Sequence, residues 1–168
     1  QFKSGIVFRG GEVLTSPFTD AHEDLLALRG LNDDREGRVQ NWLRVEYTPD
    51  AEWKLWTLRV DEKDSPAWFD EEMRLSVTAH FERLIAAMTI WTGRRRLIVG
   101  EQVIVCGDAV VGLGSCTHAV CVRDNAKVTE VRDNAKVTNV CGNAQVTEVW
   151  DNAKVTNVRD NAQVTNVR

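Results

Sequence analysis

The chain has 168 residues, a formal net charge of −4 and 43% hydrophobic residues, which fits one domain or a small two-part domain. The repeats in its last third carry nearly balanced charge, so they are neither a basic nucleic-acid surface nor a strongly acidic DNA mimic. No run approaches the length of about 18 apolar residues that a membrane span needs, and no signal peptide is visible at the start. We therefore expect a cytoplasmic protein with no membrane contact, for which a nucleic acid is not an expected partner.

Four short stretches near the start of the chain predict strands. The segments 5–9 and 12–15 flank a Gly-Gly pair, a pattern typical of a β-hairpin. In the segment 39–48, two sets of side chains alternate and would face opposite sides of a strand. After a turn, the segment 53–60 predicts another strand, which we expect to pair antiparallel with the third.

Two helices are predicted in the same part of the chain. The first covers 21–29, with Thr19 or Asp20 as its cap and Gly30 after its end. The second covers 70–89, where acidic residues begin the helix and apolar residues recur at steps of three and four to form one face. We expect this part of the chain to cover the hydrophobic start of the repeats described below.

Five of the six tryptophans precede the repeats. They are Trp42, Trp53, Trp56, Trp68 and Trp91. One interpretation is that they fill the core of a small N-terminal module; the other is that they line an aromatic ligand pocket. The first is favoured because no group of polar residues accompanies them. His22 and His80 are expected to be solvated positions on the two helices.

The last third of the chain, from Arg123 to Arg168, consists of five consecutive nine-residue units and a final arginine. Every unit contains Asn-Ala followed by Val-Thr, and a fixed short period of this kind predicts a repeat architecture. Ala126 and Val128 lie two residues apart and face one way on a strand. Val131 faces the same way only if the chain bends after Val128. Stacking such units would turn a thin core of Ala and Val into a continuous one.

The repeat pattern also predicts where the corners lie and how large each coil is. Asp-Asn pairs, such as Asp124-Asn125, mark the second corner of a unit, and both residue types tolerate left-handed backbone. Gly142 replaces Asp in the third unit, which supports a left-handed or tight turn there. Small variations recur every 18 residues, as in Glu130 and Glu148, and favour two units per coil. The alternative is that this longer period records only how the gene was duplicated.

The Asn-Ala-x-Val core resembles the short repeats of many β-solenoid proteins of bacteria and phages. The resemblance covers Arg123 to Arg168, and the spacing over 131–137 is also loosely similar to that of hexapeptide-repeat β-helices. This resemblance implies a solenoid and no activity. The period of nine differs from the shorter periods of those families, so the handedness of the coil stays open.

Together these patterns predict an α+β capping module at 1–100 followed by a β-solenoid at 101–168, with the nonapeptide repeats at 123–168. The segment 102–122 contains three strand-like stretches separated by glycines, and its Gly-Asp-Ala-Val-Val is a degraded copy of Asp-Asn-Ala-Lys-Val. We interpret this segment as irregular coils that join the module to the regular stack.

The four cysteines lack the Cys-x-x-Cys spacing of a zinc cluster and are expected to be free, mostly buried thiols. They are Cys106, Cys116, Cys121 and Cys141. Cys141 occupies the position that is Arg in other units, so we expect it to face outward. No metal, cofactor or catalytic residue is predicted.

Two enzymatic alternatives remain beside a structural or protein-interaction role, which we prefer. Hexapeptide-type acyltransferases use a histidine of the coils as general base, and His118 is the one histidine near the coils. It lacks an evident partner, and a short solenoid lacks the groove that a trimer provides. The other alternative is a small-molecule binder or enzyme that uses the Trp-rich module near Arg44 or Arg59.

The last coil is the predicted site of self-association. The chain stops at Arg168 inside the repeat pattern, so the backbone of this coil would offer a template for another strand. Ala162, Val164 and Val167 would lie on its open core face, with Thr165 beside them. We expect an isologous homodimer, joined end to end about a two-fold axis, or a higher homo-oligomer; a different protein is the other possible partner.

Overall fold

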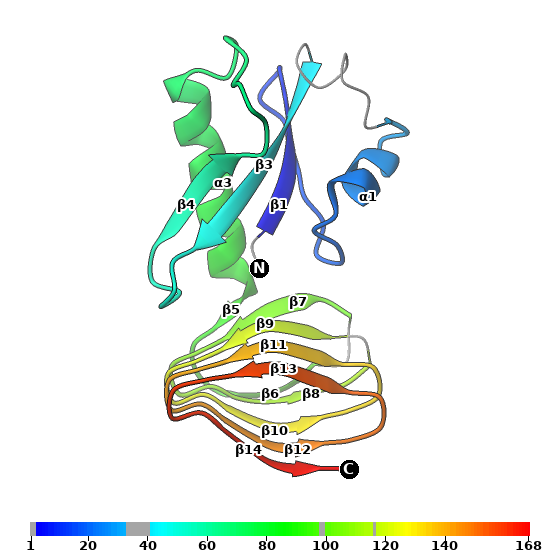
Figure 1. Ribbon diagram of the computed structural model, residues 1–168, viewed down its shortest axis with the longest axis vertical. Helices are drawn as coiled ribbons and strands as arrows, with labels where there is room; N and C mark the ends of the chain where they lie inside the picture. The colour runs from blue at the N-terminus through cyan, green and yellow to red at the C-terminus, as the bar shows by residue number, and fades with distance from the viewer. Residues whose placement is uncertain (1–2, 33–40, 98–99, 116) are drawn as a thin grey trace. The chain divides into compact units, whose positions relative to one another are not determined.

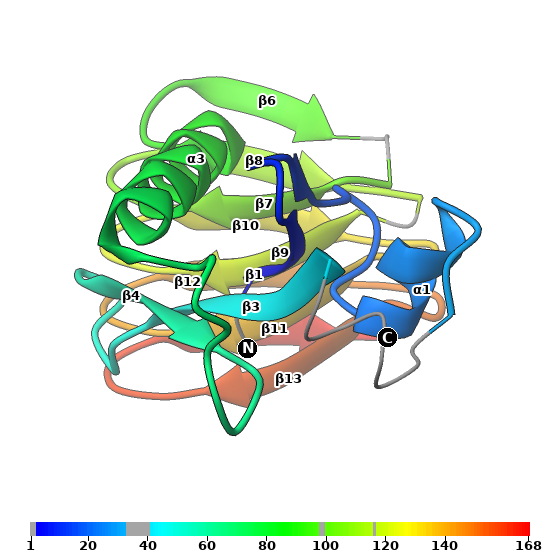
Figure 2. The ribbon, with the colours of Figure 1, turned by 90° about the horizontal axis from the view of Figure 1, so that it is seen from above.

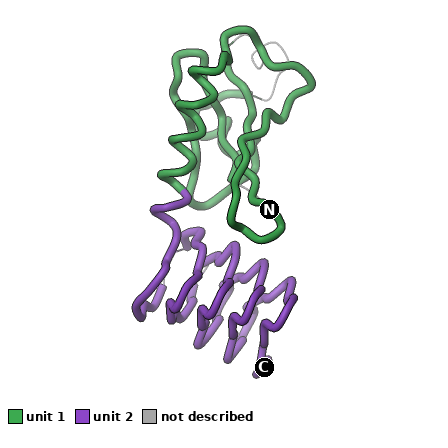
Figure 3. Tube along the Cα trace, turned by 90° about the vertical axis from the view of Figure 1, so that its left-hand side faces the viewer, with its two compact units in different colours: residues 1–84 green, residues 85–168 purple. Residues whose placement is uncertain are grey.

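The computed structural model describes residues 3–32, 41–97, 100–115 and 117–168. The chain divides into two compact units, Gln1–Leu84 and Ile85–Arg168 (Figure 3). The sequence patterns predicted this boundary at residue 100. The observed boundary lies earlier in the chain, because two short strands before residue 100 pair with strands of the solenoid. Of the helices within the described ranges, none combines the length and the apolar character needed to cross a membrane.

The first unit contains one antiparallel sheet with the strand order β2-β1-β3-β4 (Figure 1). Its strands are β1 (Lys3–Phe8), β2 (Val13–Leu14), β3 (Trp42–Pro49) and β4 (Trp56–Val60). The predicted hairpin and the antiparallel pairing of the next two strands are therefore confirmed. Positions 39 and 40 of the predicted third strand lie outside the described residues.

Two helices pack on opposite faces of this sheet (Figures 1 and 2). They are α1 (His22–Ala27) and α3 (Glu71–Met88). Leu25 of α1 packs with Ile6 of β1, whereas Phe81 of α3 stacks on Tyr47 with ring centroids 5.4 Å apart. Gly5 makes room for Phe81, because a Cβ at that position would lie 2.8 Å from its ring.

The two helices begin differently. Asp70 caps α3, and its Oδ1 accepts a hydrogen bond from the backbone N–H of Met73 at 2.9 Å. The predicted cap of α1 is wrong, because Ala21 holds the N-cap position without a side-chain bond. Asp20 instead forms a buried ion pair with Lys3, with Nζ and Oδ1 2.9 Å apart.

The second unit is a β-solenoid of two five-stranded parallel sheets (Figure 1). One sheet contains β5 (Thr89–Ile90), β7 (Gln102–Val105), β9 (His118–Val122), β11 (Lys136–Val140) and β13 (Lys154–Val158). The other contains β6 (Arg94–Leu97), β8 (Val110–Leu113), β10 (Lys127–Val131), β12 (Gln145–Val149) and β14 (Gln163–Val167). Lys136 pairs with Lys154 and Gln145 with Gln163, so two nine-residue units form one coil, as predicted.

Each corner of the regular coils begins with a residue in the left-handed region. The φ angles are 57° to 59° at four aspartates and 66° at the glycine that replaces the fifth. These residues are Asp124, Asp133, Asp151, Asp160 and Gly142. The aspartates also accept hydrogen bonds from the preceding coil, as in the 2.9 Å bond from Ser115 N to Asp133 Oδ2. Asp therefore fits the corner both in backbone preference and in hydrogen bonding.

The core between the sheets is a continuous column of Ala and Val side chains. Val128 and Val131 are both fully buried, although they lie three residues apart. The strand pairing skips Thr129 between them, and both valines lie in the single strand β10. They face inward through a local irregularity of this strand, so the corner predicted between them is wrong. The irregular coils follow the same plan: Gly107, with φ of 58°, holds the corner position ahead of β8.

Candidate functional site

The predicted self-association residues lie in the last coil. In the part of the chain that the structure describes, β13 pairs only with β11 and β14 only with β12, so each has an open edge. Ala162 and Val164 are half-buried, Val167 is 72% exposed, and Thr165 and Arg168 are also exposed. Backbone groups and apolar side chains are thus accessible together at this end of the solenoid.

An apolar hollow of about 620 Å³ opens over these strands. Its lining residues are Val149, Ala153, Lys154, Val155, Thr156, Val158, Val164 and Val167. The structure brings only two of the five predicted residues, Val164 and Val167, into this lining. The prediction omitted β13 because it considered the last nine-residue unit alone, whereas a coil contains two units. The 18-residue recurrence in the sequence was the signal that would have found the rest.

The strand β14 differs from the other strands of the regular repeats because it carries no charged residue. Each of β10, β11, β12 and β13 carries Lys, Glu or both. Charged side chains at a sheet edge oppose pairing with a further strand. The open edge of β14 lacks this protection, and it lacks proline as well.

Side-chain amides form ladders along the stack. Asn143 Nδ2 donates to Asn125 Oδ1, and Asn161 Nδ2 donates to Asn143 Oδ1, both at 3.4 Å. Asn157 donates to Asn139 in the same way, also at 3.4 Å. Since a carboxamide both donates and accepts, the last members of these ladders are chemically able to pair with the same groups of a second copy.

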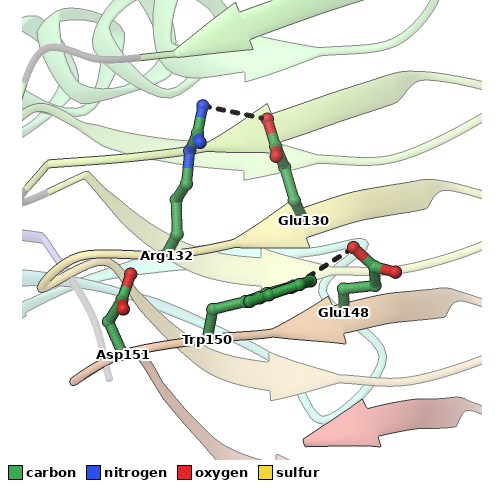
Figure 4. Close-up of a pocket in the computed structure, with 5 residues that line it drawn as sticks. All are labelled: Glu130, Arg132, Glu148, Trp150 and Asp151. Atoms are coloured by element: carbon green, nitrogen blue, oxygen red, sulfur yellow. Dashed lines mark hydrogen bonds and ion pairs between the residues drawn. The ribbon is translucent and has the colours of Figure 1, made fainter. Parts of the chain in front are cut away.

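A second hollow, of about 160 Å³, lies at a corner of the coils and is polar (Figure 4). Arg132 forms an ion pair with Glu130 at 3.6 Å, and Trp150 Nε1 donates to Glu148 at 3.1 Å. Arg168 lies over the Trp150 ring, 5.0 Å from its centroid. The first two pairs each join residues two apart in the chain, and the contact between Arg168 and Trp150 joins neighbouring coils. The arrangement is therefore explained as packing that stabilises the corner.

His118, the candidate general base, is the first residue of β9. Its Nε2 lies 2.6 Å from Thr138 Oγ1 of the next coil. Thr138 belongs to the threonine column of the repeats, so this contact also arises from stacking alone. The geometry of His118 therefore does not by itself favour an acyltransferase.

Among the described residues, one group has the spacing of a metal site. It consists of His22, Glu46 and Asp61, all in the first unit. His22 is buried, against the expectation of a solvated position, with Nε2 3.2 Å from Val45 O and Nδ1 3.6 Å from Asp61 Oδ2. Burial, together with the charge of Asp61, raises the pKa of the adjacent Glu46. Arg44 already supplies a positive charge 3.5 Å from Asp61, so the cluster is explained as an ion-pair network. Sequence reasoning missed it because its members come from three separate elements.

The tryptophans of the first unit mainly serve its core, as the sequence favoured. Trp42 and Trp53 are buried, and Trp56 stacks on Tyr47 with ring centroids 5.4 Å apart. The expectation is wrong for Trp91, which belongs to the second unit and is 54% exposed. The guanidinium of Arg123 lies 5.5 Å from the centroid of its ring.

Three cysteines of the second unit are free and buried, as predicted, while Cys116 lies outside the described residues. Burial raises the pKa of Cys106 to about 11. The expectation that Cys141 faces outward is wrong, because it is only 6% exposed. Its Sγ lies 3.9 Å from Sγ of Cys121, with a hydrogen bond between the two thiols.

Comparison of the chain with protein-family models, with curated proteins and with solved structures finds no match.

Proposed function

We propose that the protein is a non-enzymatic assembly module, two copies of which join end to end through the coil of β13 and β14. The observation that carries the proposal is the exposure of valines on this coil. Val158 is 47% and Val167 72% exposed, whereas Val140 and Val149, one coil earlier, are buried. Exposed apolar side chains beside open strand edges favour an interaction site.

A second copy suits this surface because the surface is complementary to itself. A two-fold axis places each open strand against a strand of the other copy that runs in the opposite direction, so the backbone groups can continue the ladder. The side chains of Gln163, Thr165 and Asn166 on β14 both donate and accept hydrogen bonds. β14 also brings no charge that would repel its counterpart. Association would remove the exposed valines from water, which is the main favourable term.

The test is the absolute mass of the 168-residue chain in solution, measured by light scattering over a concentration series. The wild-type protein is expected to be a dimer, and the double variant Val158→Asp/Val167→Asp a monomer at every concentration, because it would place carboxylates in an apolar contact. Both valines are already exposed, so the variant should fold like the wild type, which circular dichroism checks.

The matched control is Thr147→Asp, a change at an exposed position of β12. It adds one negative charge, against two in the double variant, and places it one coil earlier. It is expected to keep the dimeric mass. A monomeric wild type, or a dimer that survives the double substitution, would contradict the proposal. If the protein is a monomer and binds a different protein through Val158 and Val167, then the partner of this surface is that protein and not a second copy.

A further inference from the structure

Cys121 and Cys141 form a buried dithiol that bridges two neighbouring coils. Cys121 lies in β9, and Cys141 directly follows β11. Their Sγ atoms are 3.9 Å apart, and the two residues are 0% and 6% exposed. Cys141 N donates to Val122 O at 2.9 Å, so the ladder between the coils fixes the backbone beside both thiols. The pair is therefore held together by regular structure and not by a flexible loop.

We propose that Cys121 and Cys141 are an oxidisable pair that forms a disulfide between coils when hydrogen peroxide reaches Cys141. A disulfide bond is about 2.0 Å long, so the two sulfurs must approach each other by about 2 Å to form it. Peroxide is small enough to approach the slightly exposed Cys141, whereas Cys121 is closed to solvent. The proposal does not depend on end-to-end association.

The surroundings of the two thiols assign them different roles. The hydrogen bond from Cys121 lowers the pKa of Cys141, and Arg159 lowers it further, while burial and the charge of Asp160 act in the opposite direction. The same hydrogen bond, with burial, raises the pKa of Cys121 despite the charges of Arg123 and Arg159. Because the thiolate is the reactive form, Cys141 attacks the oxidant and Cys121 resolves the product.

The reaction has two balanced steps. The Cys141 thiolate attacks one oxygen of the peroxide, the O–O bond breaks, and the departing hydroxide takes up a proton to form water, which leaves Cys141 as a sulfenic acid. The Cys121 sulfur then attacks the sulfur of Cys141, the S–O bond breaks, and a second water carries away the thiol proton. The two thiols lose two electrons in total, and the peroxide gains them.

The expected consequence is a covalent link across the stack. A disulfide between Cys121 and Cys141 closes a loop of the chain and restricts its unfolded state. The loop runs from Cys121 to Cys141 in a chain of 168 residues. We therefore expect oxidation to raise the melting temperature by roughly 5–10 °C and reduction to restore its original value.

The experiment uses the full chain with Cys106→Ser and Cys116→Ser, so that only the pair remains, and adds peroxide in stoichiometric steps. Peptide mapping without reductant should find the Cys121 and Cys141 peptides joined, with the loss of two hydrogens and the expected rise in melting temperature. The rate of oxidation should increase with pH about a midpoint below the ordinary thiol pKa of 9.0, because the pKa of Cys141 is lowered.

Two further variants separate the roles of the thiols. With Cys121→Ser, Cys141 should stop at the sulfenic acid, which dimedone traps. With Cys141→Ser, Cys121 should remain a thiol at the same peroxide dose. Absence of the joined peptide in folded protein, or faster oxidation of Cys121 than of Cys141, would overturn the proposal. Circular dichroism of each variant excludes unfolding as the cause of either result.

Discussion

The strands β11 and β13 have the same sequence, Lys-Val-Thr-Asn-Val, but differ in burial. Val137 and Val140 of β11 are fully buried, whereas Val155 of β13 is half-buried and Val158 is 47% exposed. The two strands pair directly with each other in register. In the part of the chain that the structure describes, β11 has a neighbouring strand on both sides and β13 on one, which accounts for the difference. Burial in this solenoid is therefore set by position in the stack as well as by sequence.

The corners behave differently from the core. Asp133 in an inner coil and Asp160 in the last coil have nearly the same φ, 57° and 59°. Each also accepts a hydrogen bond from the preceding coil, from Ser115 N and Gly142 N respectively. A corner thus depends on its own residue and on the coil before it, whereas a core valine depends on the coils on both sides.

The largest expected effect comes from placing a charge at equivalent positions of the two identical strands. Val140→Asp should lower the free energy of unfolding by more than about 3 kcal/mol, because it buries a carboxylate without a partner. Val158→Asp should lower it by less than about 0.5 kcal/mol, because that side chain already contacts water. Urea denaturation followed by circular dichroism measures both, at a concentration where the wild type is monomeric.

Equal losses in these two variants would contradict the comparison. They would mean that Val158 is as well covered in solution as Val140. The control Thr147→Asp tests whether an added charge on an exposed part of the coil has any effect of its own.

A smaller effect is expected at the corners. Asp133→Ala should cost about 1–2 kcal/mol, because Ala is strained in left-handed backbone and cannot accept the hydrogen bond from Ser115 N. Asp133→Gly should cost less, because glycine removes the strain and loses only the hydrogen bond. Urea denaturation of the two variants separates the two contributions. If Gly were as unfavourable as Ala, the backbone conformation would not be the reason for Asp at this corner.

The sequence predicted best what the repeat period determines directly. The period shows the two-unit coil and the left-handed corners, because each recurs with the same residues. The start of the solenoid is different: β5 and β6 lack the repeat motif, and only their pairing with β7 and β8 places them in the stack. No local pattern carries that information.

The side chains that the sequence misplaced are those whose surroundings come from distant elements. His22 is buried by residues of β3 and by Asp61. His80 is half-buried, with its Nε2 lacking a hydrogen-bond partner, and burial lowers its pKa. Cys141 occupies an arginine column, and its thiol lies against Cys121 of the preceding coil. The side chain of Arg123 in the same column is itself only 13% exposed, so an arginine at a repeat position does not ensure that the position faces outward.

The smallest expected effect concerns the contact between the last residue, Arg168, and the ring of Trp150, which lies at a corner of the preceding coil. Trp150 is 37% exposed, so the cation–π contact and the ring's packing should together contribute about 0.5–1 kcal/mol. Trp150→Ala should lower the free energy of unfolding by that amount, and Trp150→Phe by less, because Phe keeps a ring beneath the guanidinium. A double-mutant cycle with Arg168→Ala isolates the pair. A coupling energy near zero would show that the two side chains merely lie side by side, and that the last coil is held to the stack by its backbone ladder and valine core alone.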